Sequence, residues 1–97
     1  MTRYVTLYQF TEQGIRNVKD SPARLKAAVK KGESIGMKIV GAYYTEGPYD
    51  LVVISEAADE KAATAFALGI AAQGNVRSTT MRAYEPDEFD AIVKMMP

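Results

Sequence analysis

One short segment of this chain carries the residues best suited to chemistry. Tyr43 and Tyr44 precede a Glu-Gly-Pro turn, and Tyr49 and Asp50 follow it. Because side chains alternate along a strand, Asp50 should share a face with the aliphatic residues two and four positions later. A carboxylate in apolar surroundings could accept a proton, with a tyrosine hydroxyl as the donor. Asp50 and Tyr49 are therefore the candidate catalytic residues.

A plainer interpretation of the same segment is structural, and the sequence favours it for Asp50. An aspartate at a strand end commonly binds backbone amides of a turn or pairs with an arginine. Arg77 could in turn hold a ligand carboxylate, or form a salt bridge to Asp50 or to acidic residues of a partner subunit. The candidate ligand-binding residues are the four around the turn and this arginine: Tyr43, Tyr44, Tyr49, Asp50 and Arg77.

The composition excludes several kinds of chemistry. The chain contains no cysteine and no histidine, which rules out disulfides, thiol catalysis and cysteine-ligated metals and removes the commonest catalytic base. No serine lies in a Gly-x-Ser-x-Gly motif, and no glycine-rich phosphate loop is present. We therefore expect neither a metal site nor a bound cofactor.

Charge is balanced over the whole chain but uneven along it. The 12 basic and 12 acidic side chains give no net charge, so nothing attracts nucleic acid or an anionic membrane in general. Residues 1–31 hold seven basic and two acidic side chains. No aromatic stacking series accompanies this basic region, so a solvated helix face or pairing between subunits explains it better than RNA binding does.

The expected location is the cytoplasm, without a membrane partner. No stretch approaches the roughly 20 apolar residues that a membrane-spanning helix needs. The first ten residues alternate in polarity, unlike the basic start and long apolar run of a signal peptide.

Four stretches have the alternation or the β-branched content of strands: residues 3–10, 37–45, 51–55 and 76–84. Gly47 and Pro48 join the second and third stretches in a hairpin. In the second stretch, regular alternation predicts that Ile39 and Tyr43 lie on one face, and Val40, Ala42 and Tyr44 on the other. Both faces of the sheet then carry apolar side chains, so both require a cover.

Three further stretches have the apolar spacing of helices. The first begins at Pro22, with Ser21 as the expected cap. The second follows a capping Asp59, and the third begins at Pro86. Residues 11–20 are polar and contain a glycine, which predicts a loop or an irregular turn.

The order of these elements predicts an α+β fold of the ferredoxin-like type. A β-α-β-β-α-β series gives an antiparallel four-stranded sheet with two helices on one face, and a last helix follows it. We expect one domain over residues 1–97. The other sheet face would remain bare and apolar, so two sheets facing each other in a homodimer, or a larger assembly of such dimers, are expected.

The chain resembles the GYD-domain family, and four motifs in order carry the resemblance: Tyr4-Val5-Thr6-Leu7, Phe10-Thr11-Glu12-Gln13-Gly14-Ile15-Arg16, Gly47-Pro48-Tyr49-Asp50 and Gly74-Asn75-Val76-Arg77-Ser78. The resemblance runs from the first strand to about Phe89. It implies a ferredoxin-like fold of the dimeric α/β-barrel type, found mostly in bacteria, and it supplies no accepted reaction. Related dimeric barrels include cofactor-independent monooxygenases, isomerases and effector-binding domains, so the fold does not determine the function.

Three functional hypotheses follow. The leading one is a homo-oligomeric cytoplasmic protein that binds a small aromatic or carboxylated molecule between the sheet and its helices. The second is a cofactor-independent isomerase or monooxygenase that uses Asp50 and a tyrosine for proton transfer. The third is a purely structural assembly unit. Whether the protein is an enzyme stays open at this stage.

Overall fold

The computed structural model describes residues 1–97. Its four strands are β1 (Thr2–Phe10), β2 (Met37–Tyr44), β3 (Leu51–Ala57) and β4 (Val76–Ala83). Its helices are α1 (Glu12–Arg16), α2 (Ser21–Ser34), α3 (Glu60–Ala72) and α4 (Pro86–Lys94), with a single 3-10 turn at Val18–Asp20. The strands form one antiparallel sheet in the order β2-β3-β1-β4. This is the ferredoxin-like arrangement that the element order predicted.

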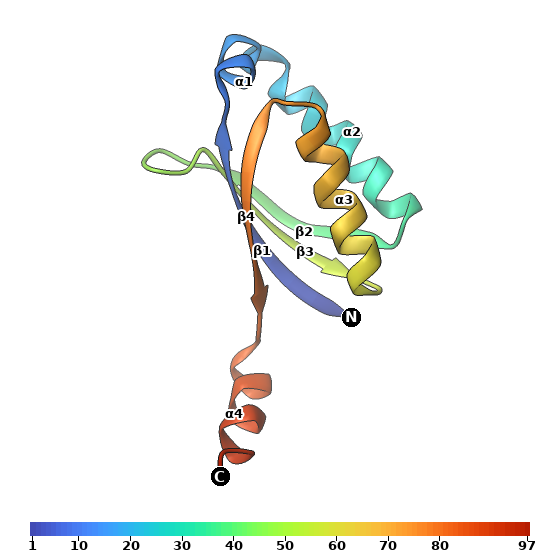
Figure 1. Cartoon of the computed structure of the whole chain (residues 1–97), viewed down its shortest axis with the longest axis vertical. Coiled ribbons are helices and arrows are strands. Elements are labelled where there is room, and N and C mark those ends of the chain that lie inside the picture. Colours follow the sequence, from blue (N-terminus) through green and yellow to red (C-terminus); the bar gives the residue numbers. More distant parts are fainter.

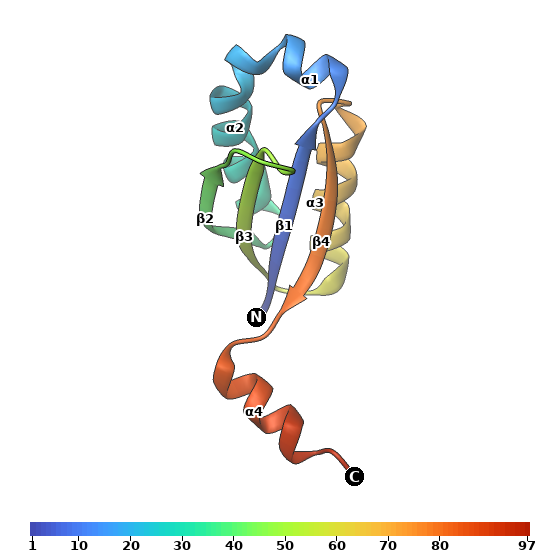
Figure 2. The same ribbon diagram turned by 90° about the vertical axis from the view of Figure 1, so that its left-hand side faces the viewer.

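The two faces of the sheet differ in what covers them. Helices α2 and α3 lie on one face (Figure 1), and no helix of the chain covers the other, which faces the viewer in Figure 2. On the helix side, Tyr8, Leu51 and Val53 form the buried cluster. The uncovered side, called the open face below, carries a row of alternate residues that includes Val5, Leu7, Val52, Ile54 and Met81. Only ten residues of the chain are buried, so the monomer has a small core.

A β-bulge in β2 corrects the predicted faces of that strand. The register with β3 shifts between Ile39 and Gly41, so one extra residue separates the two halves of the strand. As a result Ile39 lies on the helix side together with Tyr44, and Tyr43 lies on the open face. The prediction that Ile39 and Tyr43 share a face is wrong, because strict alternation cannot anticipate an inserted residue.

The segment between β1 and α2 is also more regular than predicted. Residues 12–16 form a helical turn, which Thr11 caps by accepting a hydrogen bond from the Gly14 amide at 3.1 Å. Ser21 does not cap α2, because it is the first residue of that helix. Its hydroxyl instead hydrogen-bonds the Tyr44 hydroxyl at 2.8 Å and ties α2 to β2. Asp59 caps α3 as expected, accepting from the Ala62 amide.

Helix α4 projects away from the rest of the molecule (Figures 1 and 2). The radius of gyration is 14.7 Å, against about 12.5 Å for a compact chain of this length. Ion pairs of Arg3 with Glu85 and of Arg82 with Glu88 hold its base. Its apolar stripe is exposed, with Phe89 57% accessible. None of the helices is both long and apolar enough to cross a bilayer.

Candidate functional site

Asp50 lies directly before β3 and is hydrogen-bonded to the backbone of β1. Its Oδ2 accepts a hydrogen bond of 2.8 Å from the Phe10 amide, at the last residue of β1. Its own amide donates to the Tyr8 carbonyl at 2.8 Å, and its carbonyl accepts from the Thr45 amide at 2.9 Å. The carboxylate therefore fixes the end of the central strand. This geometry supports the structural interpretation of Asp50, although the amide is in β1 and not in the turn.

The residues of the Gly-Pro turn lie at the same end of the sheet as Asp50. Gly47 has a φ of +119°, a conformation that side chains other than glycine's rarely allow. The Pro48 carbonyl accepts a hydrogen bond from Gln9 Nε2 at 2.9 Å, and the Tyr49 carbonyl accepts one from the Thr45 hydroxyl. Tyr49 itself is partly exposed. The hairpin is thus held by β1 on one side and closed on itself on the other.

A second set of bonds joins α1 to the turn between α3 and β4. The Thr11 amide donates to the Asn75 carbonyl, and the Thr11 hydroxyl donates to the Gly74 carbonyl at 2.6 Å. Gly14 allows the contact, because a Cβ there would lie 1.9 Å from the Asn75 oxygen. Three of the four motifs that suggested the family therefore meet at one end of the sheet. In this structure the three motifs form what is called the corner below, in which hydrogen bonds to the backbone join segments that are distant in the sequence.

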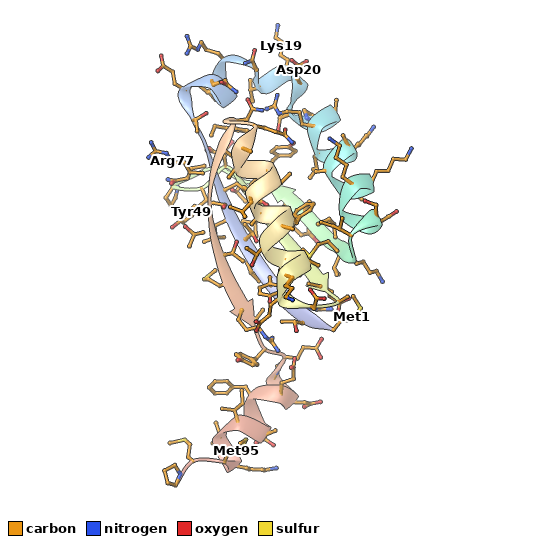
Figure 3. The ribbon with its side chains drawn as sticks, turned by 45° about the vertical axis from the view of Figure 1, so that its right-hand side comes forward. Met1, Lys19, Asp20, Tyr49, Arg77 and Met95 are labelled. Atoms are coloured by element: carbon orange, nitrogen blue, oxygen red, sulfur yellow. The ribbon has the colours of Figure 1, made fainter.

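The remaining candidate residues are divided between the two sides of the sheet. Tyr43 is 63% accessible on the open face, and Tyr44 points to the helix side, where it bonds Ser21. Arg77 pairs in register with Gln9 on the open face. Figure 3 shows Arg77 and Tyr49 on the side away from α2. The ion pairs of the chain include none between Arg77 and Asp50. These five candidates do not converge on one enclosed site.

A partly open cavity lies between the sheet and its helices. The cavity of about 70 Å³ has a mostly apolar lining and includes Tyr8, Val53, Phe66 and Ile70. Burial raises the pKa of the Tyr8 hydroxyl above its usual value of 10.0, so this phenol is neutral near pH 7. No group of three or more acidic, histidine or cysteine side chains is placed to hold a metal ion.

A wider groove adjoins this cavity. It has a volume of about 570 Å³ and runs between α2 and α3, within the size range of small-molecule pockets. The cavity and the groove share five lining residues: Arg24, Ala28, Phe66, Ile70 and Gln73. Of these, Arg24 has one guanidinium nitrogen, Nη2, that is buried without a hydrogen-bond partner.

Arg24 and Tyr8 are the site residues that the sequence prediction missed. Arg24 is one of six basic residues around α2, and only its position in the fold distinguishes it from its solvated neighbours. In the sequence, Tyr8 is one of several apolar residues of the first strand, and nothing local sets it apart. A polar residue on the sheet-facing side of α2, close to the helix start, was the available signal for Arg24.

The family model for the GYD domain matches residues 4–93, nearly the whole chain. The chain belongs to the GYD-domain family. The resemblance drawn from its four motifs is thereby confirmed. Three of these motifs form the corner described above.

This GYD domain is similar to one protein of named activity and to two solved structures. A Thermus thermophilus protein named "glutamine synthetase and cystathionine beta-lyase binding protein" is 30% identical over 95 residues, which cover 97% of this chain and 100% of the relative. The crystal structure of FFRP-DM1 matches with a TM-score of 0.59 at 21% identity, covering 87% of this chain and 100% of that one. TTHA0845, also from Thermus thermophilus, matches with a TM-score of 0.56 at 21% identity, covering 88% and 95%. The two structures support the fold alone.

Proposed function

We propose that this protein is a homodimeric cytoplasmic binding module that takes up a small aromatic or carboxylated molecule between its sheet and its helices. The observation that carries the binding function is the cavity under α2 and α3 together with the groove into which it opens. Both are lined mostly by apolar side chains with a few polar groups, which is the usual composition of small-molecule sites. The proton-transfer alternative is weaker, because the Asp50 carboxylate is already bonded to the Phe10 amide.

The homodimer is argued from the open face. Val5, Leu7, Val52 and Ile54 are partly exposed there in neighbouring strands, and a monomer rarely leaves such a continuous apolar face in water. Four strands of about eight residues present a projected area of roughly 500 Å². A stable interface buries about 800 Å² on each partner.

Helix α4 can supply the interface area that the open face lacks. The helix projects away from its own sheet (Figure 2), and Phe89, Ile92 and Val93 of its apolar stripe are all exposed. In the proposed dimer, the open faces of two copies pack together and the α4 of each copy lies against the other. A second copy is the occupant that supplies both a flat apolar face and a matching projecting helix.

The dimer is tested by placing a charge at the centre of the open face. Ile54→Glu should produce a folded monomer in analytical ultracentrifugation, because a carboxylate cannot be buried unpaired between two sheets. Leu68→Glu is the matched control, since Leu68 is 65% accessible on α3 and outside the proposed interface. A dimer that persists in Ile54→Glu would contradict the sheet-to-sheet arrangement.

Ligand binding is tested by native mass spectrometry of the purified protein, followed by gentle denaturation to release any bound molecule. A reproducible small mass on each subunit supports the binding module. The variant Ala28→Leu should abolish that mass, because Ala28 lines both the cavity and the groove and a larger side chain would fill the space between them. An unchanged mass in this variant would place the ligand elsewhere.

A second candidate function is association with metabolic enzymes. It is favoured by the relative whose printed name is that of a protein binding glutamine synthetase and cystathionine beta-lyase, matched over its whole length. The test is surface plasmon resonance or sedimentation with purified glutamine synthetase and with purified cystathionine beta-lyase. Saturable binding of either enzyme, retained in Ala28→Leu, would establish an adaptor function separate from the ligand site. A failure to bind either enzyme would contradict the adaptor function and would not affect the proposed ligand-binding function.

A further inference from the structure

The feature that calls for a ligand is the guanidinium of Arg24, in the first turn of α2. Its Nη1 donates a hydrogen bond of 3.0 Å to the Asn17 carbonyl, which fixes the plane of the group. Its Nη2 is buried and has no acceptor. A buried charged donor without an acceptor is rare in folded proteins, because the energy lost on leaving water is not recovered.

No ion pair of the chain involves Arg24. Arg24 lines both the cavity and the groove, and neither lining includes an aspartate or a glutamate. A second cation, Lys31, lines the groove. The free donor and this uncompensated positive charge favour an anion, and a planar guanidinium suits a carboxylate in particular.

The space beside Arg24 limits the rest of the ligand. The cavity of about 70 Å³ has room for about five water-sized groups at 10–15 Å³ each. Leu25, Val29, Ile39 and Val53 are among its lining residues, so the part of the ligand that enters it is apolar. A short branched alkyl chain has the required size.

An α-ammonium group would find no counterpart in this site. Besides Arg24, the polar side chains of the cavity lining are those of Tyr8, Ser21, Gln73 and Asn75, and none of them supplies a negative charge. A buried cation without an acidic partner is costly. The site therefore discriminates against amino acids that have the same alkyl chain.

We propose that Arg24 binds the carboxylate of a short aliphatic acid without an ammonium group, with the alkyl chain in the cavity between α2 and the sheet. This inference rests on the proposed function, because it specifies the ligand class of the same cavity. Arg24 is the residue that determines specificity for the anion, and the apolar lining determines the length of the chain.

The probes are 3-methylbutanoate, its uncharged amide and leucine, measured by isothermal titration calorimetry and by NMR chemical shifts of the full chain. The wild-type protein should bind 3-methylbutanoate saturably, and at least about tenfold more tightly than the amide or leucine. Arg24→Gln should abolish this preference. Arg16→Gln is the matched control, because the Arg16 side chain is 69% accessible and pairs with Glu12, so this variant should bind like wild type.

Arg24→Lys serves as a second variant if Arg24→Gln does not fold, which thermal unfolding will show. Lysine keeps the charge and loses the planar fork, so the preference for the acid should fall but persist. If the acid and the amide bind equally and Ala28→Leu blocks both, the cavity binds ligands and the assignment of Arg24 is wrong. If no probe binds saturably to wild type, this inference fails. If, in addition, native mass spectrometry finds no bound molecule, the proposed function fails too.

Discussion

The hydrogen bond between the Asp50 carboxylate and the Phe10 amide makes a quantitative prediction about stability. The bond is 2.8 Å long and partly buried. In Asp50→Ala the amide would lose its acceptor, at a cost of about 2 kcal/mol in the free energy of unfolding. For a chain of this length, 1 kcal/mol corresponds to about 4–8 °C in Tm, so the expected fall is about 8–16 °C.

Asp50→Asn separates the charge of the carboxylate from its role as an acceptor. The asparagine oxygen can still accept from the Phe10 amide, but without the gain of a charged acceptor, so the cost should be about 1 kcal/mol and about 4–8 °C. Differential scanning calorimetry at one fixed protein concentration measures both variants. Glu46→Gln is the control, because Glu46 lies exposed in the same hairpin. Thermal stability within about 2 °C of wild type for Asp50→Ala would refute the structural role.

Three further predictions concern other single groups. The raised pKa of the buried Tyr8 phenol contributes to the stability of the folded state below the usual value of 10.0, and this contribution is lost as the pH rises through the folded value. Between pH 8 and a pH above 10, the free energy of unfolding should therefore fall less in Tyr8→Phe than in wild type. At the base of α4, the hydrogen bond from the Glu85 amide, together with the charge of Arg82, lowers the pKa of Glu88 below its usual 4.5. Its contribution to stability is therefore present above that value and lost as the pH falls through the folded value. The NMR shift of the Glu85 amide, which donates to Glu88 Oε1, should change less below pH 4.5 in Glu88→Gln than in wild type. Gly14→Ala should lower the free energy of unfolding by about 2 kcal/mol or more, because the added Cβ would clash with Asn75. Gly69→Ala has open space around it and should raise the free energy of unfolding by about 0.5–1 kcal/mol. Equal effects of the two variants on Tm would contradict the close approach of Gly14 to Asn75.

The fold could be predicted because its signals are local. Alternating or β-branched stretches mark all four strands, and Asp59 and Pro86 mark two helix starts. The failures share one cause, which is that distant segments decide the local structure. The turn at residues 12–16 depends on Thr11 reaching the backbone at 74–75, and the hydroxyl of Ser21 is used by Tyr44.

The candidate site was harder to predict than the fold. Sequence reasoning selected conspicuous residues of the hairpin, and Asp50 among them is bonded to the backbone of another strand. Arg24 was hidden in a run of basic residues. Its unpartnered nitrogen is a property of three-dimensional packing, and neither spacing nor residue type could reveal it.

The central position of β1 has a consequence for synthesis of the chain. β1 is made first, but its two neighbours are β3 and β4, and β4 ends only at Ala83. Until β4 has left the ribosome, one edge of β1 has no partner and remains open to other chains. The sheet therefore cannot be completed until Ala83 has emerged, and slow translation of the segment between β3 and β4 would lengthen the period in which nascent chains can aggregate.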